Sequence, residues 1–152
     1  MQNTFNLKSP VQFLALGFGS GLAPKAPGTF GTLAAVPLFL LCANLSDLYL
    51  GLLIVFMSVV GIYLCGKTAE AVGVDDHPAI VWDEFVGLFI TLYLTDITWL
   101  TVLVGFVLFR FFDILKPWPI SVVDRKLHGG FGIMLDDILA GFAALLCMQL
   151  IF

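Results

Sequence analysis

Hydrophobic residues are gathered into long runs, and most prolines, glycines and charged residues lie in the stretches between them. The five runs cover residues 29–43, 48–65, 80–95, 99–115 and 133–152. A helix that crosses a membrane needs about 20 apolar residues, with about 17 as the lower limit. The second and fifth runs meet this length alone, and the third and fourth meet it if their charged ends lie at the membrane surface. The first run is short and contains Pro37, so we expect it to be bent, tilted or re-entrant.

The composition indicates that lipid is the solvent for much of this chain. Hydrophobic residues make up 60% and charged residues 12%, against roughly 45–50% and about 25% in ordinary soluble domains. The mean hydropathy is +1.03. In lipid the backbone must satisfy its own hydrogen bonds, so the runs predict helices rather than open strands. With 152 residues, we expect a single domain spanning 1–152: an all-α integral membrane bundle of about five helices.

The positive charges predict an orientation. The short connections at 44–47 and 95–98 contain no Lys or Arg. If both face outward, all seven basic residues fall on the inner side, which is the positive-inside pattern. The N-terminus is then cytoplasmic, segment 1–28 is cytoplasmic or interfacial with a short helix at 11–18, and the C-terminus is outside. We expect no cleavable signal peptide, and one helical turn around 120–127 in an otherwise irregular loop.

Nine carboxylates fall on the inner side, and five of them lie at the inner ends of hydrophobic runs. These five are Asp83, Glu84, Asp113, Asp136 and Asp137. Helix capping is an alternative explanation for Asp136 or Asp137, but it does not suit Asp113, which lies near a helix C-terminus. Ionisable groups within apolar sequence are costly and tend to mark function. The set therefore predicts an oxygen-rich site for a hard cation, with Mg²⁺ as the natural candidate.

Basic residues accompany these acids. Arg110 and Asp113 are three residues apart and share a helix face, so they form either a simple ion pair or part of a phosphate site. Lys116 lies near the same membrane face, where it is either a phosphate ligand or only a topology signal. Pro117 predicts that the helix ends there.

A glycine-rich stretch precedes the first run. Its residues 28–31 can expose backbone N–H groups to an anion, and Lys25 adds a positive charge, although a turn-rich entry loop is the plain alternative. His77 and His128 lie in polar loops without a second His or Cys at ligand spacing, so we interpret both as surface residues. The three cysteines show no metal-ligand spacing and are interpreted as small apolar residues.

Four motifs occur in order along the chain. They are GSGLAPKAPGTFGTL at 19–33, WDEFVG at 82–87, FRFFDILKPWPI at 109–120 followed by DR at 124–125, and MLDDILAG at 134–141. In this order the sequence resembles the phosphatidylglycerophosphatase A family of Mg²⁺-dependent bacterial membrane lipid phosphatases, over about residues 17–144.

The resemblance implies hydrolysis of phosphatidylglycerophosphate to phosphatidylglycerol and phosphate in phospholipid biosynthesis. It also implies Mg²⁺ as cofactor, multi-pass insertion in the bacterial inner membrane, and a site on the cytoplasmic side. The family's motif acids fall at Asp83, Glu84, Asp113, Asp136 and Asp137, and its basic and hydroxyl residues fall at Lys25, Thr29, Arg110 and Lys116.

On this basis the acids are expected to share two tasks. We expect catalytic roles for Asp83, Glu84, Asp113 and Asp137. We expect metal binding by Asp83, Glu84, Asp136 and Asp137. We expect the substrate phosphate to be bound by Lys25, Thr29, Arg110 and Lys116. Which acids bind metal and which act as base or nucleophile stays open; the absence of a D-x-D-x-[TV] pattern favours attack by water over an aspartyl-phosphate.

Three alternatives belong to other classes. Another metal-dependent lipid-phosphate enzyme, such as a CDP-alcohol phosphotransferase, would need a D-G-x₂-A-R spacing that this chain lacks. A transporter would need ionisable groups near the bilayer midplane, whereas the charges here gather at one end. A non-catalytic membrane partner protein would have little use for so many charges on one face. Membrane lipids are expected partners, and the net charge of −4 argues against nucleic acid.

Overall fold

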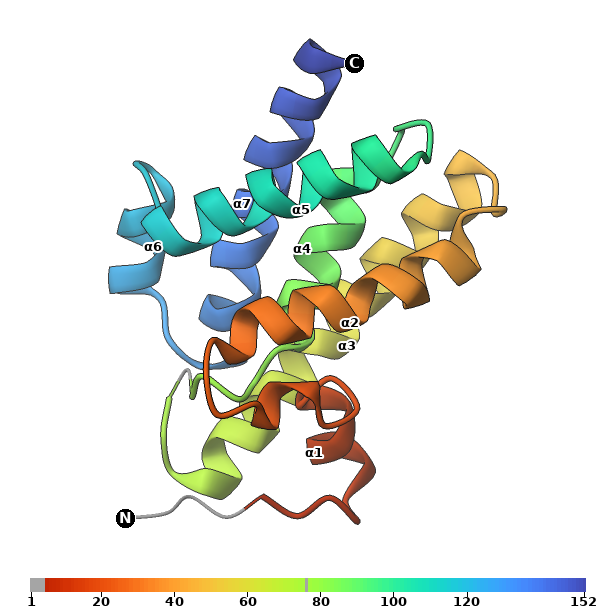
Figure 1. The fold of residues 1–152 in the computed structure, drawn as a ribbon. Coiled ribbons are helices and arrows are strands. Elements are labelled where there is room, and N and C mark those ends of the chain that lie inside the picture. The colour runs from red at the N-terminus through yellow and green to blue at the C-terminus, as the bar shows by residue number, and fades with distance from the viewer. Residues whose placement is uncertain (1–4, 76) are drawn as a thin grey trace.

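The protein is helical throughout the part of the chain that the structure, a computed structural model, describes: residues 5–75 and 77–152. Within these residues there is no strand, so the prediction of an all-α protein is confirmed (Figure 1). Residues 1–4 of the predicted N-terminal segment and Asp76, one of the predicted inner-side carboxylates, lie outside the described residues. In chain order the elements are α1 (Pro10–Ala15), the 3₁₀ helix η1 (Ser20–Leu22), α2 (Pro27–Cys42), α3 (Asp47–Val72), α4 (Trp82–Leu92), α5 (Trp99–Leu115), α6 (Ile120–Lys126) and α7 (Gly129–Ile151).

Helices α3 and α7 are long and apolar enough to cross a membrane. At a rise of about 1.5 Å per residue, their 26 and 23 residues extend roughly 39 and 35 Å, beyond the ~30 Å hydrocarbon core of a bilayer. Both keep large apolar side chains on the outer surface, including Phe56 and Val59 on α3 and Leu146 and Leu150 on α7. Exposing such apolar faces to water is unfavourable, so they favour contact with lipid. Helix α2 is a shorter apolar helix.

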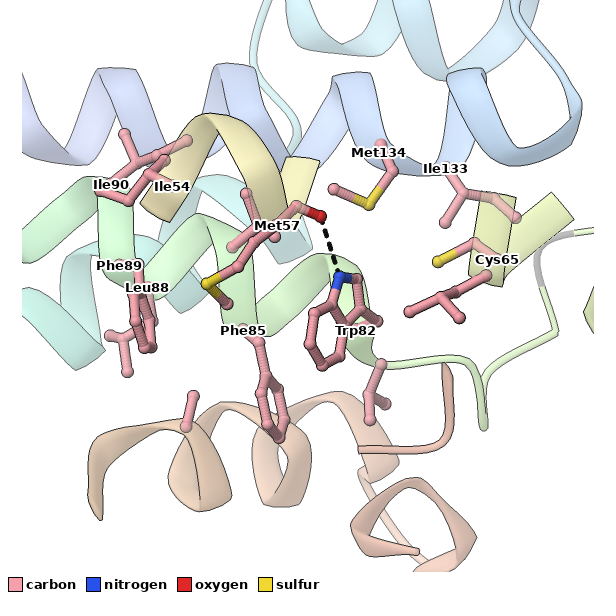
Figure 2. Packing of buried hydrophobic residues seen from close by; sticks show 14 of the residues in the cluster. Ile54, Met57, Cys65, Trp82, Phe85, Leu88, Phe89, Ile90, Ile133 and Met134 are labelled. Atoms are coloured by element: carbon pink, nitrogen blue, oxygen red, sulfur yellow. Dashed lines mark hydrogen bonds between the residues drawn. The ribbon is translucent and has the colours of Figure 1, made fainter. Parts of the chain in front are cut away.

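Helix α4 lies at the centre of the bundle, and all 11 of its residues are buried. It packs against α2, α3, α5 and α7, and it is apolar on nearly every side, which is the pattern of a helix enclosed by others. The Trp82 indole N–H donates to the Met57 carbonyl oxygen of α3 at 3.0 Å, and its ring stacks on Phe85 (Figure 2). At about 16 Å, α4 covers only half of a bilayer core. The predicted run at 80–95 is therefore helical over 82–92 alone.

Helix α4 crosses α7 where two glycines face each other. A Cβ added at Gly141 of α7 would lie 2.8 Å from the carbonyl oxygen of Gly87. A Cβ added at Gly87 would meet the ring of Phe109 in α5 and would lie 3.2 Å from the carbonyl oxygen of Asp137. Small residues are what allow helix backbones to approach this closely. Glu84 and Asp137 lie about one turn before these glycines, so the crossing brings both acids to the same level of the bundle.

Two helices are longer than the hydrophobic runs that predict them. Helix α3 continues through polar residues to Val72, and α7 begins at Gly129, four residues before its run. The glycines at the start of α7 suggest a loop in the sequence. In the structure Gly130 packs on the backbone of α3, where a Cβ would clash with the carbonyl oxygen of Ile62. The predicted turn around 120–127 is present as α6, and α1 overlaps the predicted helix at 11–18.

The end of α5 matches the prediction from Pro117. Lys116 leaves the helix in the left-handed region, with φ of 48°, and its N–H donates to the Phe112 carbonyl oxygen at 2.9 Å. A proline at the next position has no N–H with which to continue the ladder. Phe109 is fully buried and Phe111 lies on the outer surface, so the aromatic residues around Arg110 face both the core and the surroundings.

Replacing Gly87 should separate the three helices that meet there. We expect Gly87→Ala to lower the free energy of unfolding by about 1–3 kcal/mol, because the new methyl group has no room beside Phe109 and Asp137. Thermal unfolding of the purified protein in detergent measures the effect.

Gly66→Ala in α3 is the matched control. Its Cβ would lie 3.4 Å from the Gly130 nitrogen, an ordinary contact, and alanine favours the helix by about 0.5–1 kcal/mol. Equal melting temperatures for the wild type and Gly87→Ala would contradict the close crossing.

Candidate functional site

Three helices bring five carboxylates to one cavity. Asp83 and Glu84 lie in the first turn of α4, Asp113 lies in the last turn of α5, and Asp136 and Asp137 lie on α7. All five side chains are buried. They line a cavity of about 240 Å³ together with Lys116, His77, Pro78 and Ile80. The structure thus brings together all five acids that the sequence predicts as a group.

The capping explanation for the acids of α7 is wrong. Helix α7 begins at Gly129, and its first turn contains no acidic residue. Asp136 and Asp137 therefore lie about two turns inside the helix, with 4% and 2% of their surface exposed. At that depth they neither cap the helix nor gain from its dipole, whose influence is confined to the first turn. Their burial needs another compensation.

The two predicted cations inside the cluster are each shared between acids. The Arg110 guanidinium donates to Asp113 through Nη1, and the same nitrogen lies 3.8 Å from Glu84 Oε1. Lys116 Nζ lies 3.1 Å from Asp136 Oδ2 and 3.4 Å from Asp113 Oδ1. The predicted ion pair of Arg110 and Asp113 is present, and Lys116 joins α5 to α7 rather than marking topology alone.

The surroundings of Lys116 keep it charged. Burial by itself would lower the pKa of its ammonium group, but the nearby carboxylates of Asp113, Asp136 and Asp137 outweigh this and raise the pKa above its ordinary value. Both cations keep unused donors. Lys116 has three N–H groups and two carboxylate partners, and Arg110 Nε has no hydrogen-bond partner among the described residues.

The start of α2 also reaches the cluster. A Cβ added at Gly28 would lie 3.0 Å from Glu84 Oε1 and 3.1 Å from Arg110 Nη2, so the first turn of α2 rests against that pair. Thr29 is the next residue and is half-buried, whereas Lys25 is exposed in the preceding loop and does not line the cavity. Of this predicted stretch, the structure therefore brings Gly28 to the acids and leaves Lys25 outside them.

The interpretation of His77 as a surface residue is incomplete, because this half-buried residue also lines the cavity. The loop between α3 and α4 folds over the cavity, where His77 is half-buried and forms part of the wall. Its Nδ1 accepts the Ala79 N–H at 3.0 Å, and its ring packs edge-on against Phe5. In the sequence, the position of His77 six residues before Asp83 is the feature that could have indicated its place near the acids. His128 is exposed as predicted and pairs with Asp75 at 3.3 Å.

The acids offer what a hard cation requires. Oxygens of these side chains approach within 4.8 Å of one another in groups of three. Asp83 Oδ1, Glu84 Oε2 and Asp137 Oδ2 are buried and have no hydrogen-bond partner in the described part of the chain. Leaving charged oxygens buried without partners is costly, and a divalent ion held by carboxylates would satisfy them. The donor set is all oxygen, which suits Mg²⁺ rather than a soft metal.

In the part of the chain that the structure describes, the fold and the site define a helical protein with two helices suited to a membrane and a buried carboxylate centre. The sequence model of the family described as Phosphatidylglycerophosphatase A matches residues 13–152. The chain belongs to this family.

Named relatives agree with this assignment. Proteins named phosphatidylglycerophosphatase A from Escherichia coli strain K12 and Haemophilus influenzae are each 48% identical to this chain. Their alignments cover 92% and 93% of this chain and 82% and 88% of the relatives. A Bacteroides thetaiotaomicron protein named putative phosphatidylinositol-3-phosphatase is 37% identical over 84% of both chains. No solved structure matches the chain significantly.

Removing the charge of Lys116 should destabilise the junction of α5 and α7. We expect Lys116→Met to lower the free energy of unfolding by about 2 kcal/mol at neutral pH, less than for a fully buried pair because the side chain is 26% exposed. Because the pKa of Lys116 is raised on folding, this stabilisation is complete below its ordinary value of 10.5 and is lost as the pH rises above it.

Thermal unfolding of both proteins at neutral and alkaline pH tests this. The difference in melting temperature should shrink above a pH of about 10.5. Lys67→Met, which removes an exposed pair with Glu70 in α3, is the control and should change stability by less than ~0.5 kcal/mol. A Lys116→Met protein as stable as this control would disprove the role of the junction.

Proposed function

We propose that this protein is a lipid phosphatase that hydrolyses phosphatidylglycerophosphate to phosphatidylglycerol and phosphate. The observation that carries the proposal is the cavity lined by five buried carboxylates and Lys116, with Arg110 paired to Asp113 beside it, in an apolar helical bundle. A phosphate carried by a lipid stays at the membrane surface, and a site at the helix ends reaches it while the acyl chains stay among apolar residues. Relatives that are 48% identical bear the name of this activity.

Mg²⁺ is the proposed cofactor, held by Asp83, Glu84, Asp136 and Asp137. The unpartnered buried oxygens of three of these residues support the choice. When bound, the ion would supply positive charge to the phosphoryl oxygens as a Lewis acid. Positioning and electrostatic stabilisation then supply most of the rate in phosphoryl transfer.

The chain's own cations are proposed to bind the substrate phosphate. Arg110 presents a planar fork whose Nε is unused, and Lys116 has one N–H left after its two carboxylate partners. The first turn of α2 lies against Arg110 at Gly28, and the backbone there and the hydroxyl of the next residue, Thr29, are proposed to contribute as well. Lys25 is proposed to attract the anionic head group from the loop before α2.

The membrane placement is part of the proposal. We expect α2, α3, α5 and α7 to cross the bacterial inner membrane, and the chain from the start of α4 to the connection at 95–98 to make the fifth crossing inside the bundle, where α4 alone covers about half of the hydrocarbon core. The N-terminus and the acid cluster then lie on the cytoplasmic side. The complete absence of Lys and Arg from the connections at 44–47 and 95–98 supports this orientation. An apolar groove of about 570 Å³ between α2 and α5, lined by residues such as Val36 and Leu103, lies toward the Trp99 end of α5 and is available to lipid chains there.

Phosphate release from purified protein in detergent is the direct test. We expect turnover of phosphatidylglycerophosphate that requires Mg²⁺ and exceeds turnover of phosphatidic acid and phosphatidylinositol 3-phosphate. Glu84→Gln and Asp137→Asn should each lower kcat by about 10³-fold or more, because each removes a charged oxygen from the site.

Both variants should keep the helical circular dichroism and the chromatographic behaviour of the wild type. Near-normal activity in both would disprove the metal assignment. Wild-type preference for phosphatidylinositol 3-phosphate would instead favour the activity in the name of the Bacteroides relative.

The shape of Arg110 should matter as well as its charge. We expect Arg110→Lys to lower kcat/KM by about 10²-fold, because an ammonium group cannot replace a planar fork that serves both carboxylates and phosphate. Steady-state kinetics with the same lipid measure the change, and Arg125→Lys, at an exposed position on α6, is the control. Equal kcat/KM values for the two variants would contradict the proposal that Arg110 binds the substrate phosphate.

A further inference from the structure

The acid cluster contains two groups of three carboxylates, and Asp137 belongs to both. One group is Asp83, Asp136 and Asp137, and the other is Glu84, Asp113 and Asp137. In each group, one oxygen from every residue lies within 4.8 Å of the others. Oxygens on opposite sides of a single Mg²⁺ lie about 4.2 Å apart, at bond lengths of about 2.1 Å. Small side-chain movements would therefore let either group close on an ion.

The balance of charge argues for more than one ion. With every carboxyl group ionised, the five acids carry five negative charges, and the ion pairs found among the described residues set the two positive charges of Arg110 and Lys116 against them, which leaves an excess of three negative charges. One divalent cation would leave the cluster with a net charge of −1, which still repels an anionic phosphate. Two would give +1, which attracts it. In a buried site this difference of sign weighs far more than it would in water.

The unpartnered oxygens are distributed over both groups. Asp83, whose Oδ1 is unpartnered, belongs to the first group; Glu84, whose Oε2 is unpartnered, belongs to the second; and Asp137, whose Oδ2 is unpartnered, is the residue that the groups share. All three residues are buried, with 5%, 8% and 2% of their surface exposed, and all three line the cavity. A single ion in either group would leave a buried charged oxygen of the other group without a partner, which is costly.

We propose that the site holds two divalent cations, one in each group of three carboxylates, with the Asp137 carboxylate between them. This inference rests on the proposed function in taking Mg²⁺ as the ion, and it goes beyond it in the number of ions and the sharing of Asp137. It also assigns the acids to separate tasks: Asp83 and Asp136 hold one ion, and Glu84 and Asp113 hold the other.

Mn²⁺ is a suitable probe, because it shares the oxygen-rich coordination of Mg²⁺ and is paramagnetic. Equilibrium dialysis of the full-length wild type in detergent should give two Mn²⁺ per chain, and electron paramagnetic resonance should show a magnetically coupled pair. Asp83→Asn and Glu84→Gln should each leave one Mn²⁺ and an uncoupled spectrum. Asp137→Asn should weaken the binding of both ions by at least about tenfold.

Glu70→Gln is the matched control, because Glu70 is an exposed carboxylate on α3 that pairs with Lys67 of the same helix, away from the acid cluster. It should retain two coupled ions. One Mn²⁺ per wild-type chain with the spectrum of an isolated ion would overturn the proposal, and so would two uncoupled ions that persist in both Asp83→Asn and Glu84→Gln.

Phosphate release from phosphatidylglycerophosphate, measured on the same samples, separates the two proposals. A wild type that turns over the lipid with one ion bound would refute the pair of ions and leave the proposed function standing. A wild type that binds two coupled ions and releases no phosphate would support the pair and refute the proposed function. Wild-type stoichiometry decides the question even where a variant fails to fold.

Discussion

At Gly87 the backbone of α4 touches α7, and the ring of Phe109 covers the same glycine from α5. Three helices meet at this point. Gly87 lies about one turn after Glu84 on α4, its contact on α7 lies close to Asp137, and Phe109 directly precedes Arg110 on α5. A side chain at Gly87 would force these helices apart, and the carboxylates that they carry would separate with them. The glycine of the WDEFVG motif therefore belongs to the site, although it contributes no polar group to it.

The close approach makes the site electrostatically costly. Arg110 serves both Glu84 and Asp113, and Lys116 serves both Asp113 and Asp136, so two cations are spread over more acids than they can neutralise. Burial of the apolar surface of α4 and its neighbours stabilises the fold and offsets the cost of this excess negative charge. A cluster built this way is poorly satisfied by the protein alone and well suited to hold cations and an anionic substrate.

The positions of the main helices could be predicted from hydropathy, because a long apolar run has few polar groups to pair with its backbone and is most readily satisfied as a helix. The boundaries could not. Helix α3 extends to Val72 through residues too polar to signal a span, and α7 begins at glycines that resemble loop residues until Gly130 is seen against α3. The run at 80–95 is apolar because protein surrounds it, and its helix is only half the length of a span.

The sequence by itself predicted that the five acids, Arg110 and Lys116 lie at one level of the bundle, since hydropathy and helical spacing fix the level of each residue along its own helix. Only the tertiary structure decided which groups meet. Helix crossings bring Asp137 into both groups of acids, move Gly28 against Arg110 and fold His77 over the cavity, while Lys25 stays outside. These pairings depend on the distance and the angle at which the helices pack. Many residues that are distant in the chain determine that packing together.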